Sequence, residues 1–252
     1  MEVHVVNGRE YMLACLDRQA PIGAAPLFVD SFELIPKADW KPSDLRHLVS
    51  LAWSQGLHGA CVSFGCEKAD DTLRRAGHQV EIKRSPWDLY RRINGGHDAG
   101  ANIHDALTVM RDEGVCNLEL CPQFTLDQTR TAAQAANASL HKLLEFSDCP
   151  DRVSIATALQ RGFPVPFGVT VTTSWTPDSD GWIWPRGSSR GGHCVMGFGF
   201  AFHVVKKVWG IPFCNSWDTD WGVNGWGIYP LDLVDDNYAD AWAARVVTLV
   251  NE

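Results

Sequence analysis

The chain has 252 residues, of which 45% are hydrophobic and 21% charged, and its formal net charge is −8. This composition is typical of a folded globular protein rather than a disordered one. The acidic balance argues against a nucleic-acid-binding protein, and the apolar stretches fall short of the roughly 18 residues of a membrane span. The N-terminus shows no secretory pattern, so we expect eight reduced cysteines and a cytoplasmic protein, with association with a virion as a variant of that location.

The first forty residues predict a hairpin followed by a connector. Asn7-Gly8 separates two apolar stretches within residues 3–15, and this pair is typical of a tight β-turn. Residues 21–26 are rich in Pro, Gly and Ala. We therefore interpret residues 1–40 as a regulatory or packing segment and residues 41–252 as the main domain.

Apolar residues at helical spacing dominate the chain from there to about residue 161, and β-type patterns follow. The predicted helices are 43–54, 61–77, 85–93, 102–113, 126–146 and 152–161. The predicted strands are 164–173, 194–202, 204–212, 226–230 and 241–250. This order indicates an α+β fold with a helical lobe at about 41–161, an antiparallel β-rich lobe at about 162–252, and a cleft between them.

Cys61 is the candidate nucleophile, because it ends a glycine-broken loop and opens a predicted helix. Backbone N–H groups and the helix dipole at such an N-terminus favour the thiolate, which is the attacking species. Gly59 leaves room for a substrate beside the sulfur. The side-chain amide of Gln55 and the backbone N–H of Cys61 would together stabilise an oxyanion.

Two later segments supply the remaining parts of acyl-transfer chemistry. His193 follows two glycines at the start of an apolar strand, and Asn215 precedes Ser216-Trp217 in a loop rich in Gly and Trp. The Asn side-chain oxygen accepts one imidazole N–H and so fixes the tautomer and ring angle. The tryptophans would shield that hydrogen bond from water.

At these three segments the sequence resembles the papain-like cysteine peptidases. The matches are Gln-Gly-x-x-Gly-Ala-Cys-x-x-Phe at 55–64, His-x-Val at 193–195 and Asn-Ser-Trp-x-x-x-Trp-Gly at 215–222. The order Cys, His, Asn and the separations of roughly 130–150 residues fit that group. Weaker matches near 85–90, 105–116 and 158–165 resemble bacterial or phage-type members and extend the likeness over about residues 40–230.

The resemblance implies a two-lobe papain-like fold and hydrolysis of peptide bonds through an acyl-thioester on Cys61, without a cofactor or metal. His193 would be the general acid and base, Asn215 would orient it, and Gln55 would lie in the oxyanion hole. The residues implied to contact an extended peptide or protein substrate are Gly59, Gly100, Ala101, Gly192, Trp217 and Trp221. Nucleic acid and membrane are not expected as partners, and the oligomeric state is left open.

The sequence departs from the family pattern at three positions. His58 stands where the family usually has a cysteine, Val62 where it has an aromatic residue, and Gly192 where it often has an aspartate. The first departure excludes the disulfide that the family forms at this loop. Because only about 60 residues precede Cys61, a long helical propeptide is not expected, and control of activity is assigned to the hairpin or to a partner.

Other functions remain open at this point. The same groups would serve peptide ligation or deamidation, because an acyl-enzyme reacts with an amine as well as with water. A structural or binding component of a larger assembly, such as a viral one, would keep the fold with little activity.

Several further polar groups are better explained by structure than by chemistry. Cys116 and Cys121 with Cys149 or His141 do not fit the common zinc spacings, so buried thiols are expected. His58 is interpreted as a solvated loop histidine. The acidic group around residues 232–236 is interpreted as a surface turn. Cys194 lies next to the candidate base, so among the thiols it is the one expected to cross-link to Cys61 under oxidation.

Overall fold

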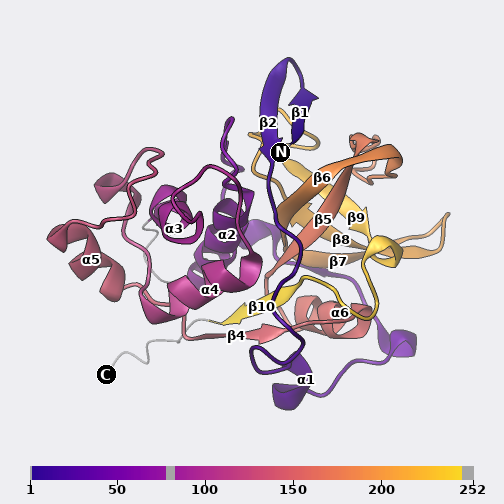
Figure 1. Ribbon diagram of the computed structural model, residues 1–252. Coiled ribbons are helices and arrows are strands. Elements are labelled where there is room, and N and C mark those ends of the chain that lie inside the picture. Colours follow the sequence, from indigo (N-terminus) through magenta and orange to yellow (C-terminus); the bar gives the residue numbers. More distant parts are fainter. Residues whose placement is uncertain (1, 78–82, 246–252) are drawn as a thin grey trace.

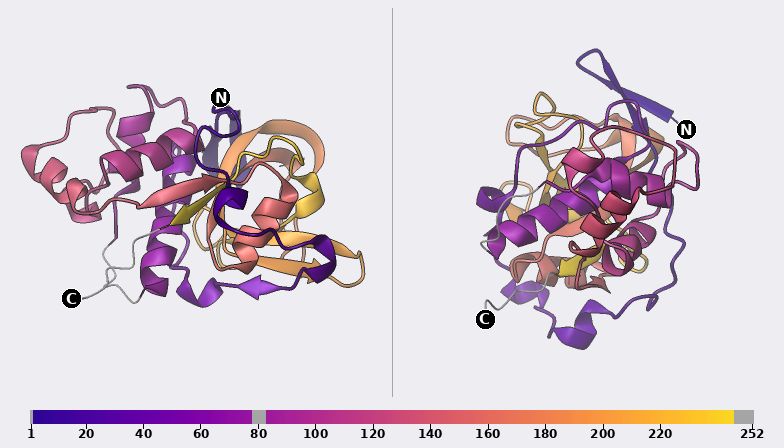
Figure 2. Two further views of the ribbon diagram at one scale, coloured as in Figure 1. Left: turned by 90° about the horizontal axis from the view of Figure 1, so that it is seen from below. Right: turned by 90° about the vertical axis from the view of Figure 1, so that its left-hand side faces the viewer.

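The computed structural model describes residues 2–77 and 83–245. Most helices lie on one side of the molecule and the large sheet lies on the other, in Figure 1 and again in the view from below in Figure 2. The helical side contains α2 (Cys61–Ala76), α3 (Pro86–Ile93), α4 (Ile103–Asp112) and α5 (Ala132–Ser139). The other side contains the large antiparallel sheet, so the predicted α+β fold is confirmed.

The large sheet has the strand order β3-β7-β8-β6-β5, and β9 pairs with β8. Its strands are β3 (Ser43–Asp44), β5 (Val165–Ser174), β6 (Arg186–Gly197), β7 (Gly199–His203), β8 (Val208–Cys214) and β9 (Trp226–Pro230). In the pairing of β6 with β8, Met196 lies opposite Cys214. This register brings the strand of His193 next to the residue that follows β8, which is Asn215.

Helix α2 packs against the inner face of β6 and β5. Its apolar residues share a buried cluster with Cys194, Met196 and Phe198 of the sheet side. The contact is close, since a Cβ on Gly65 would lie 2.9 Å from Sγ of Cys194. A second buried cluster fills the sheet half and includes Phe167, Phe213, Trp217 and Trp221.

A small two-stranded sheet joins the two sides below this contact. Strand β4 (Glu145–Asp148) pairs antiparallel with β10 (Trp242–Arg245), and α6 (Arg152–Gln160) packs against β5 and β7. The predicted strand 241–250 is confirmed as far as Arg245, and its remainder lies outside the described residues. The short α1 is Phe28–Ser31, and four 3-10 helices span Lys37–Asp39, Arg46–Leu48, Leu118–Leu120 and Leu231–Leu233.

The N-terminal hairpin is formed by β1 (Glu2–Val6) and β2 (Arg9–Leu13). Asn7 and Gly8 at its turn have φ of 50° and 76°, the left-handed values that a two-residue hairpin turn requires. The prediction of a hairpin is therefore confirmed. From β2 the indigo chain runs down the junction between helices and sheet toward α1 (Figure 1).

Two predicted helices are wrong. Residues 43–54 form β3, a 3-10 turn and loop, because Ser43 and Asp44 pair with Phe200 and Gly199 at the edge of the sheet. Residues 126–146 are helical only at Ala132–Ser139. In both regions tertiary contacts override helical spacing.

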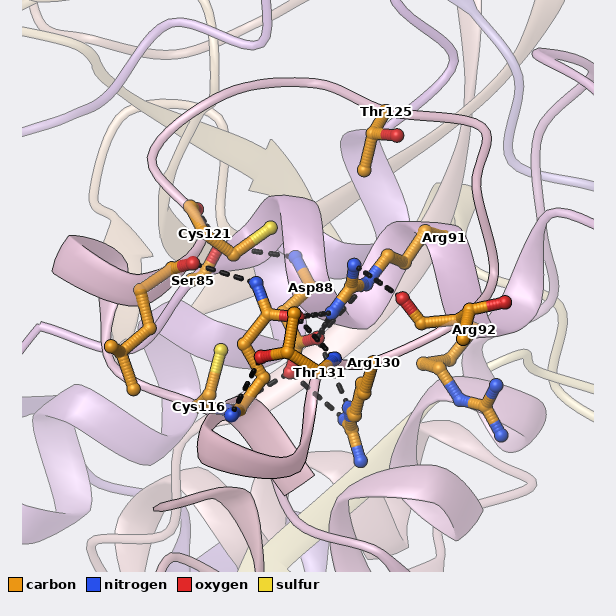
Figure 3. Close-up of polar contacts among 12 residues, drawn as sticks. Ser85, Asp88, Arg91, Arg92, Cys116, Cys121, Thr125, Arg130 and Thr131 are labelled. Carbon is orange, nitrogen blue, oxygen red and sulfur yellow. Dashed lines mark hydrogen bonds and ion pairs between the residues drawn. The ribbon is translucent and has the colours of Figure 1, made fainter. Parts of the chain in front are cut away.

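A buried ion cluster around Asp88 explains why the predicted helix 126–146 does not begin before Ala132. Figure 3 shows the guanidinium groups of Arg91 and Arg130 at the Asp88 carboxylate, at 2.7 and 2.9 Å. Arg130 is thus held inside the protein, and Thr131 accepts a hydrogen bond from the backbone N–H of Gln134 and starts α5. A helix through residues 126–131 would remove Arg130 from its carboxylate.

Within the described part of the chain, no helix combines the length and the apolar character that spanning a membrane takes. All eight cysteines are buried and free. The described residues also hold no group of three or more His, Cys, Asp or Glu side chains suited to a metal ion.

Candidate active site

Cys61 is the first residue of α2, and its side chain is fully buried. The loop before it approaches other backbone closely, since a Cβ on Gly59 would lie 2.8 Å from the Tyr90 hydroxyl and 2.9 Å from the Gly100 nitrogen. Only glycine fits at position 59. The sulfur thus lies at a helix N-terminus, as the sequence indicates.

His193 and Asn215 form the pair that the sequence predicts. Nε2 of His193 lies 2.7 Å from Oδ1 of Asn215, and the same oxygen accepts the Ser216 backbone N–H at 2.8 Å. Because this oxygen only accepts hydrogen bonds, the imidazole proton is on Nε2. Nδ1 of His193 is buried and has no hydrogen-bond partner, so it is the basic nitrogen.

The two predicted tryptophans cover this pair. The Trp217 ring stacks on the His193 ring with centroids 4.6 Å apart, and Trp221 meets Trp217 edge-on at 5.6 Å. Both indoles are buried. They exclude water from the bond between His193 and Asn215, which strengthens it.

The sulfur of Cys61 lies against the strand that carries His193. Backbone groups of Cys194, Ala14 and Val62 act to lower the pKa of this thiol. The hydrogen bonds of residues 2–77 and 83–245 do not include one between Sγ of Cys61 and the His193 imidazole. The candidate nucleophile and base thus come from two elements that pack together, α2 and β6.

The side-chain amide of Gln55 is held on both sides. Its oxygen accepts the Ser216 hydroxyl at 2.6 Å, and its nitrogen donates to the His58 carbonyl at 2.8 Å and to the Met12 carbonyl at 3.0 Å. The position in which a substrate oxyanion would bind is therefore next to a carbonyl of the chain's own N-terminal segment.

The same segment, residues 12–16, occupies two of the predicted substrate contacts, Gly192 and Ala101. Cys15 donates its N–H to the Gly192 carbonyl at 3.0 Å, and Leu16 donates to the Ala101 carbonyl at 3.0 Å. Ala101 in turn donates to the Ala14 carbonyl at 3.2 Å. We call residues 12–16 the covering segment. The sequence predicts the hairpin that precedes the covering segment, but no local pattern indicates where the covering segment itself lies.

This burial changes the protonation of Cys61 and His193. Burial raises the pKa of the Cys61 thiol to about 12, while backbone hydrogen bonds lower it only in part. Burial also lowers the pKa of His193 to about 4, against the opposing hydrogen bond to Asn215. The covered site therefore holds a neutral thiol and a neutral imidazole, in place of the thiolate expected from the helix N-terminus.

His58 has a structural role that its interpretation as a solvated residue misses. Its Nδ1 lies 2.9 Å from Oδ2 of Asp98, and its ring stacks on Phe124 at 3.7 Å. Oδ1 of Asp98 accepts the Gly59 backbone N–H at 2.8 Å and the Tyr90 hydroxyl at 2.7 Å. This network ties the loop before Cys61 to the segment that leads to Gly100. No disulfide can do so in this chain, because His58 stands where the family usually has a cysteine.

A model of the papain family of cysteine proteases matches residues 35–231, more than half of the chain. The chain belongs to this family. It is therefore a cysteine-type peptidase, that is, a thiol protease and a hydrolase.

Individual relatives agree with this assignment. An uncharacterized peptidase C1-like protein of Acanthamoeba polyphaga mimivirus is 27% identical over an alignment of 242 residues that covers 81% of this chain and 74% of that protein. Xylellain, a cysteine protease from Xylella fastidiosa, has a similar structure with a TM-score of 0.77 at 19% identity, covering 97% of this chain and 100% of its own. Bromelain from Ananas comosus follows at a TM-score of 0.64 and 15% identity, over 84% and 100% of the two chains. At these identities the structures establish the fold.

Proposed function

We propose that the protein hydrolyses peptide bonds of extended peptides or proteins through an acyl-thioester on Cys61. The observation that carries this proposal is the 2.7 Å contact between His193 and Asn215. It leaves Nδ1 of the imidazole without a hydrogen-bond partner and so able to accept the thiol proton.

In the first step Nδ1 of His193 takes the proton of Cys61, and the sulfur attacks the substrate carbonyl carbon. The oxygen becomes an oxyanion, which the Gln55 amide and the Cys61 backbone N–H stabilise. Collapse of this intermediate breaks the C–N bond, and His193 gives its proton to the departing amine. Water, deprotonated by His193, then attacks the thioester, and the acid product leaves as the thiol is restored.

We also propose that the covering segment keeps the peptidase latent. It takes the Gln55 N–H and the backbone groups of Ala101 and Gly192 that an extended substrate would need. A peptide pairing along the cleft would have to displace it first. With the segment in place, the thiol is both inaccessible and neutral.

The test uses the full-length chain with Ala14→Glu. Ala14 is buried, and its methyl group fills the space that a Cβ on Gly59 or Gly100 would need, at 2.9 and 2.8 Å. A longer, charged side chain has no room there and expels the segment. Hydrolysis of a fluorogenic peptide library is expected to rise at least about tenfold over the wild type, with Ala14→Ser as the matched control that stays near the wild type.

Two results would contradict the proposal. Equal activity of Ala14→Glu and Ala14→Glu/Cys61→Ala would exclude Cys61 as nucleophile. Unchanged activity of a folded Ala14→Glu protein would exclude latency by the covering segment. Product masses measured with and without an added amine separate hydrolysis from peptide ligation, and a protein inactive in every variant would favour the structural role.

A further inference from the structure

Two cysteines are neighbours where the covering segment crosses the strand of His193. Cys15 of that segment donates its backbone N–H to the Gly192 carbonyl of β6 at 3.0 Å. Residues two apart on a strand point to the same face, so Cys194 shares the face of Gly192. Cys15 and Cys194 also belong to one buried cluster. The covering segment thus brings a second thiol to the face of β6 that carries Cys194.

This close approach depends on the glycine at position 192. A Cβ there would overlap the carbonyl oxygen of Cys15 and would lie 3.7 Å from its Cβ. The family often has an aspartate at this position, and no room remains for one beside the covering segment. The departure to glycine therefore allows Cys15 to lie directly against β6.

The two thiols act on each other. The Cys194 side chain, ahead of burial, raises the pKa of the Cys15 thiol well above its ordinary value. Burial raises the pKa of Cys194 to about 12, while the Cys15 side chain acts against that rise. Toward Cys61, by contrast, Cys194 acts through its backbone. The thiol that pairs with Cys194 in the structure is therefore that of Cys15, whereas the sequence points to Cys61.

An oxidant would meet the two thiols in a fixed order. Cys15 is 8% exposed and lines a pocket of about 360 Å³, whereas Cys194 is 0% exposed. A small reagent in this pocket reaches Cys15 first. Cys194 lies behind Cys15 and can complete the exchange.

We propose that Cys15 and Cys194 form a reversible disulfide that locks the covering segment over Cys61. The inference rests on the proposed function, because it concerns control of the same cleft. The oxidant is a low-molecular-weight disulfide such as glutathione disulfide. The Cys15 thiolate attacks it and releases one small thiol, and the Cys194 thiolate then attacks Sγ of Cys15 and releases the other. Two protein thiols are oxidised, one small disulfide is reduced, and the two protons leave on the released thiols.

The lock would change how the cleft opens. In the reduced protein, hydrogen bonds and packing hold the covering segment, so it can open by local unfolding. A disulfide from Cys15 to Cys194 would tie the segment to β6 directly beside His193. Reduction would restore the opening, so the latent peptidase would respond to the thiol–disulfide balance around it.

The experiment follows the full-length wild-type chain before and after treatment with glutathione disulfide at mildly alkaline pH. Remaining thiols are blocked, and a digest is mapped by mass without reduction. We expect a linked pair of peptides that carry Cys15 and Cys194. After the oxidant is removed, Cys61 should react with iodoacetamide at least about tenfold more slowly than in the reduced protein, because the disulfide restricts opening. Dithiothreitol should restore the original rate.

Variants assign the effect to this pair of thiols. In Cys15→Ser and in Cys194→Ala the oxidant should leave the rate at Cys61 unchanged, each variant being compared with its own reduced form. Cys66→Ala is the matched control, because Cys66 is fully buried in the same cluster but lies on α2. It should retain both the linked peptides and the slower reaction.

The inference is overturned if no peptides linked through Cys15 and Cys194 form, if they form without slowing the reaction of Cys61, or if Cys194 links to Cys61 instead. Glutathione attached to Cys61, with equal slowing in Cys15→Ser, would also overturn it. Neither readout requires turnover. Failure of the proposed function therefore has a different signature, since Ala14→Glu would then hydrolyse nothing while the wild type still forms the lock.

Discussion

At the candidate catalytic centre and beside it, several polar groups are bound by partners from the first eighteen residues. Gln55 binds the Met12 carbonyl, and Arg18 binds the buried Asp148. Cys61, His193, Asn215 and Gln55 could be found from sequence because each stands in a short local pattern. Asp98 and Arg18 could not, since their partners lie 40 and 130 residues away.

Arg18 anchors the end of the covering segment in the protein interior. Its side chain is 2% exposed and that of Asp148 is 0% exposed. Arg18→Leu leaves a carboxylate buried without its counter-charge, so we expect the free energy of unfolding to fall by about 3–5 kcal/mol in denaturant titration. A loss below about 1 kcal/mol would mean that Asp148 finds another partner.

An exposed arginine provides the comparison. Arg9 makes two ion pairs with Asp218 and Asp220, at 3.1 and 3.3 Å, and its side chain is 55% exposed. Surface pairs contribute little, so Arg9→Leu should cost less than about 1 kcal/mol. The double variant Arg18→Leu/Asp148→Leu should recover much of the loss, because both buried charges are gone.

At the scale of elements, the contact between α2 and β6 sets the position of the nucleophile relative to the base. The sequence predicts α2 within one residue of its observed end, because the helical spacing of its apolar residues and the glycine at its end agree. It does not predict the loops at 43–54 and 126–131, where an edge-strand pairing and a buried Arg130 decide the structure. Local spacing carries no information about such distant partners.

Gly65 tests how tightly this contact is packed. In an isolated helix alanine would be favoured over glycine by about 1 kcal/mol. Here the added methyl group would lie 2.9 Å from Sγ of the fully buried Cys194. We expect Gly65→Ala to lower the free energy of unfolding by about 1–3 kcal/mol, measured by denaturant titration.

Removal of the opposing sulfur gives the control. Gly65→Ala/Cys194→Ala should be more stable than Gly65→Ala alone, because the methyl group then occupies the space of the thiol. A Gly65→Ala protein more stable than the wild type would show that Cys194 can move aside.

At the scale of the whole molecule, the two sides and the cleft between them follow from the order of helical and β patterns. The path of residues 12–16 does not, because it depends on backbone contacts with Ala101 and Gly192 that any sequence of small residues could make. The covered cleft also explains why Cys61 has a raised pKa at a position that normally favours the thiolate.

Alkylation of Cys61 reports this covering. With the thiol pKa at about 12, the rate of reaction with iodoacetamide should rise about tenfold per pH unit between about pH 7 and pH 10, because only the thiolate reacts. In Ala14→Glu the rate at neutral pH should be higher than in the wild type. As the pH is raised, this rate should reach its plateau at a lower pH than the wild-type rate does. Peptide mass mapping over time measures both.

Cys149 serves as the internal reference, because burial also raises its pKa and it lies outside the cleft. Its labelling should be the same in both proteins. Acceleration at Cys149 as well would indicate general loosening rather than an opened cleft.

The two ends of the N-terminal arm are held very differently. The tip of the hairpin rests on exposed pairs at Arg9, whereas Tyr11 behind the tip is buried and the far end of the arm is fixed by the buried Arg18. The arm can therefore peel away from its tip and still remain tethered, so that it competes with substrate as an intramolecular ligand. Such a tether corresponds to an effective concentration of the arm on the order of millimolar. Dilution of the enzyme would therefore not activate the peptidase. A peptide that binds tightly or is abundant would activate it.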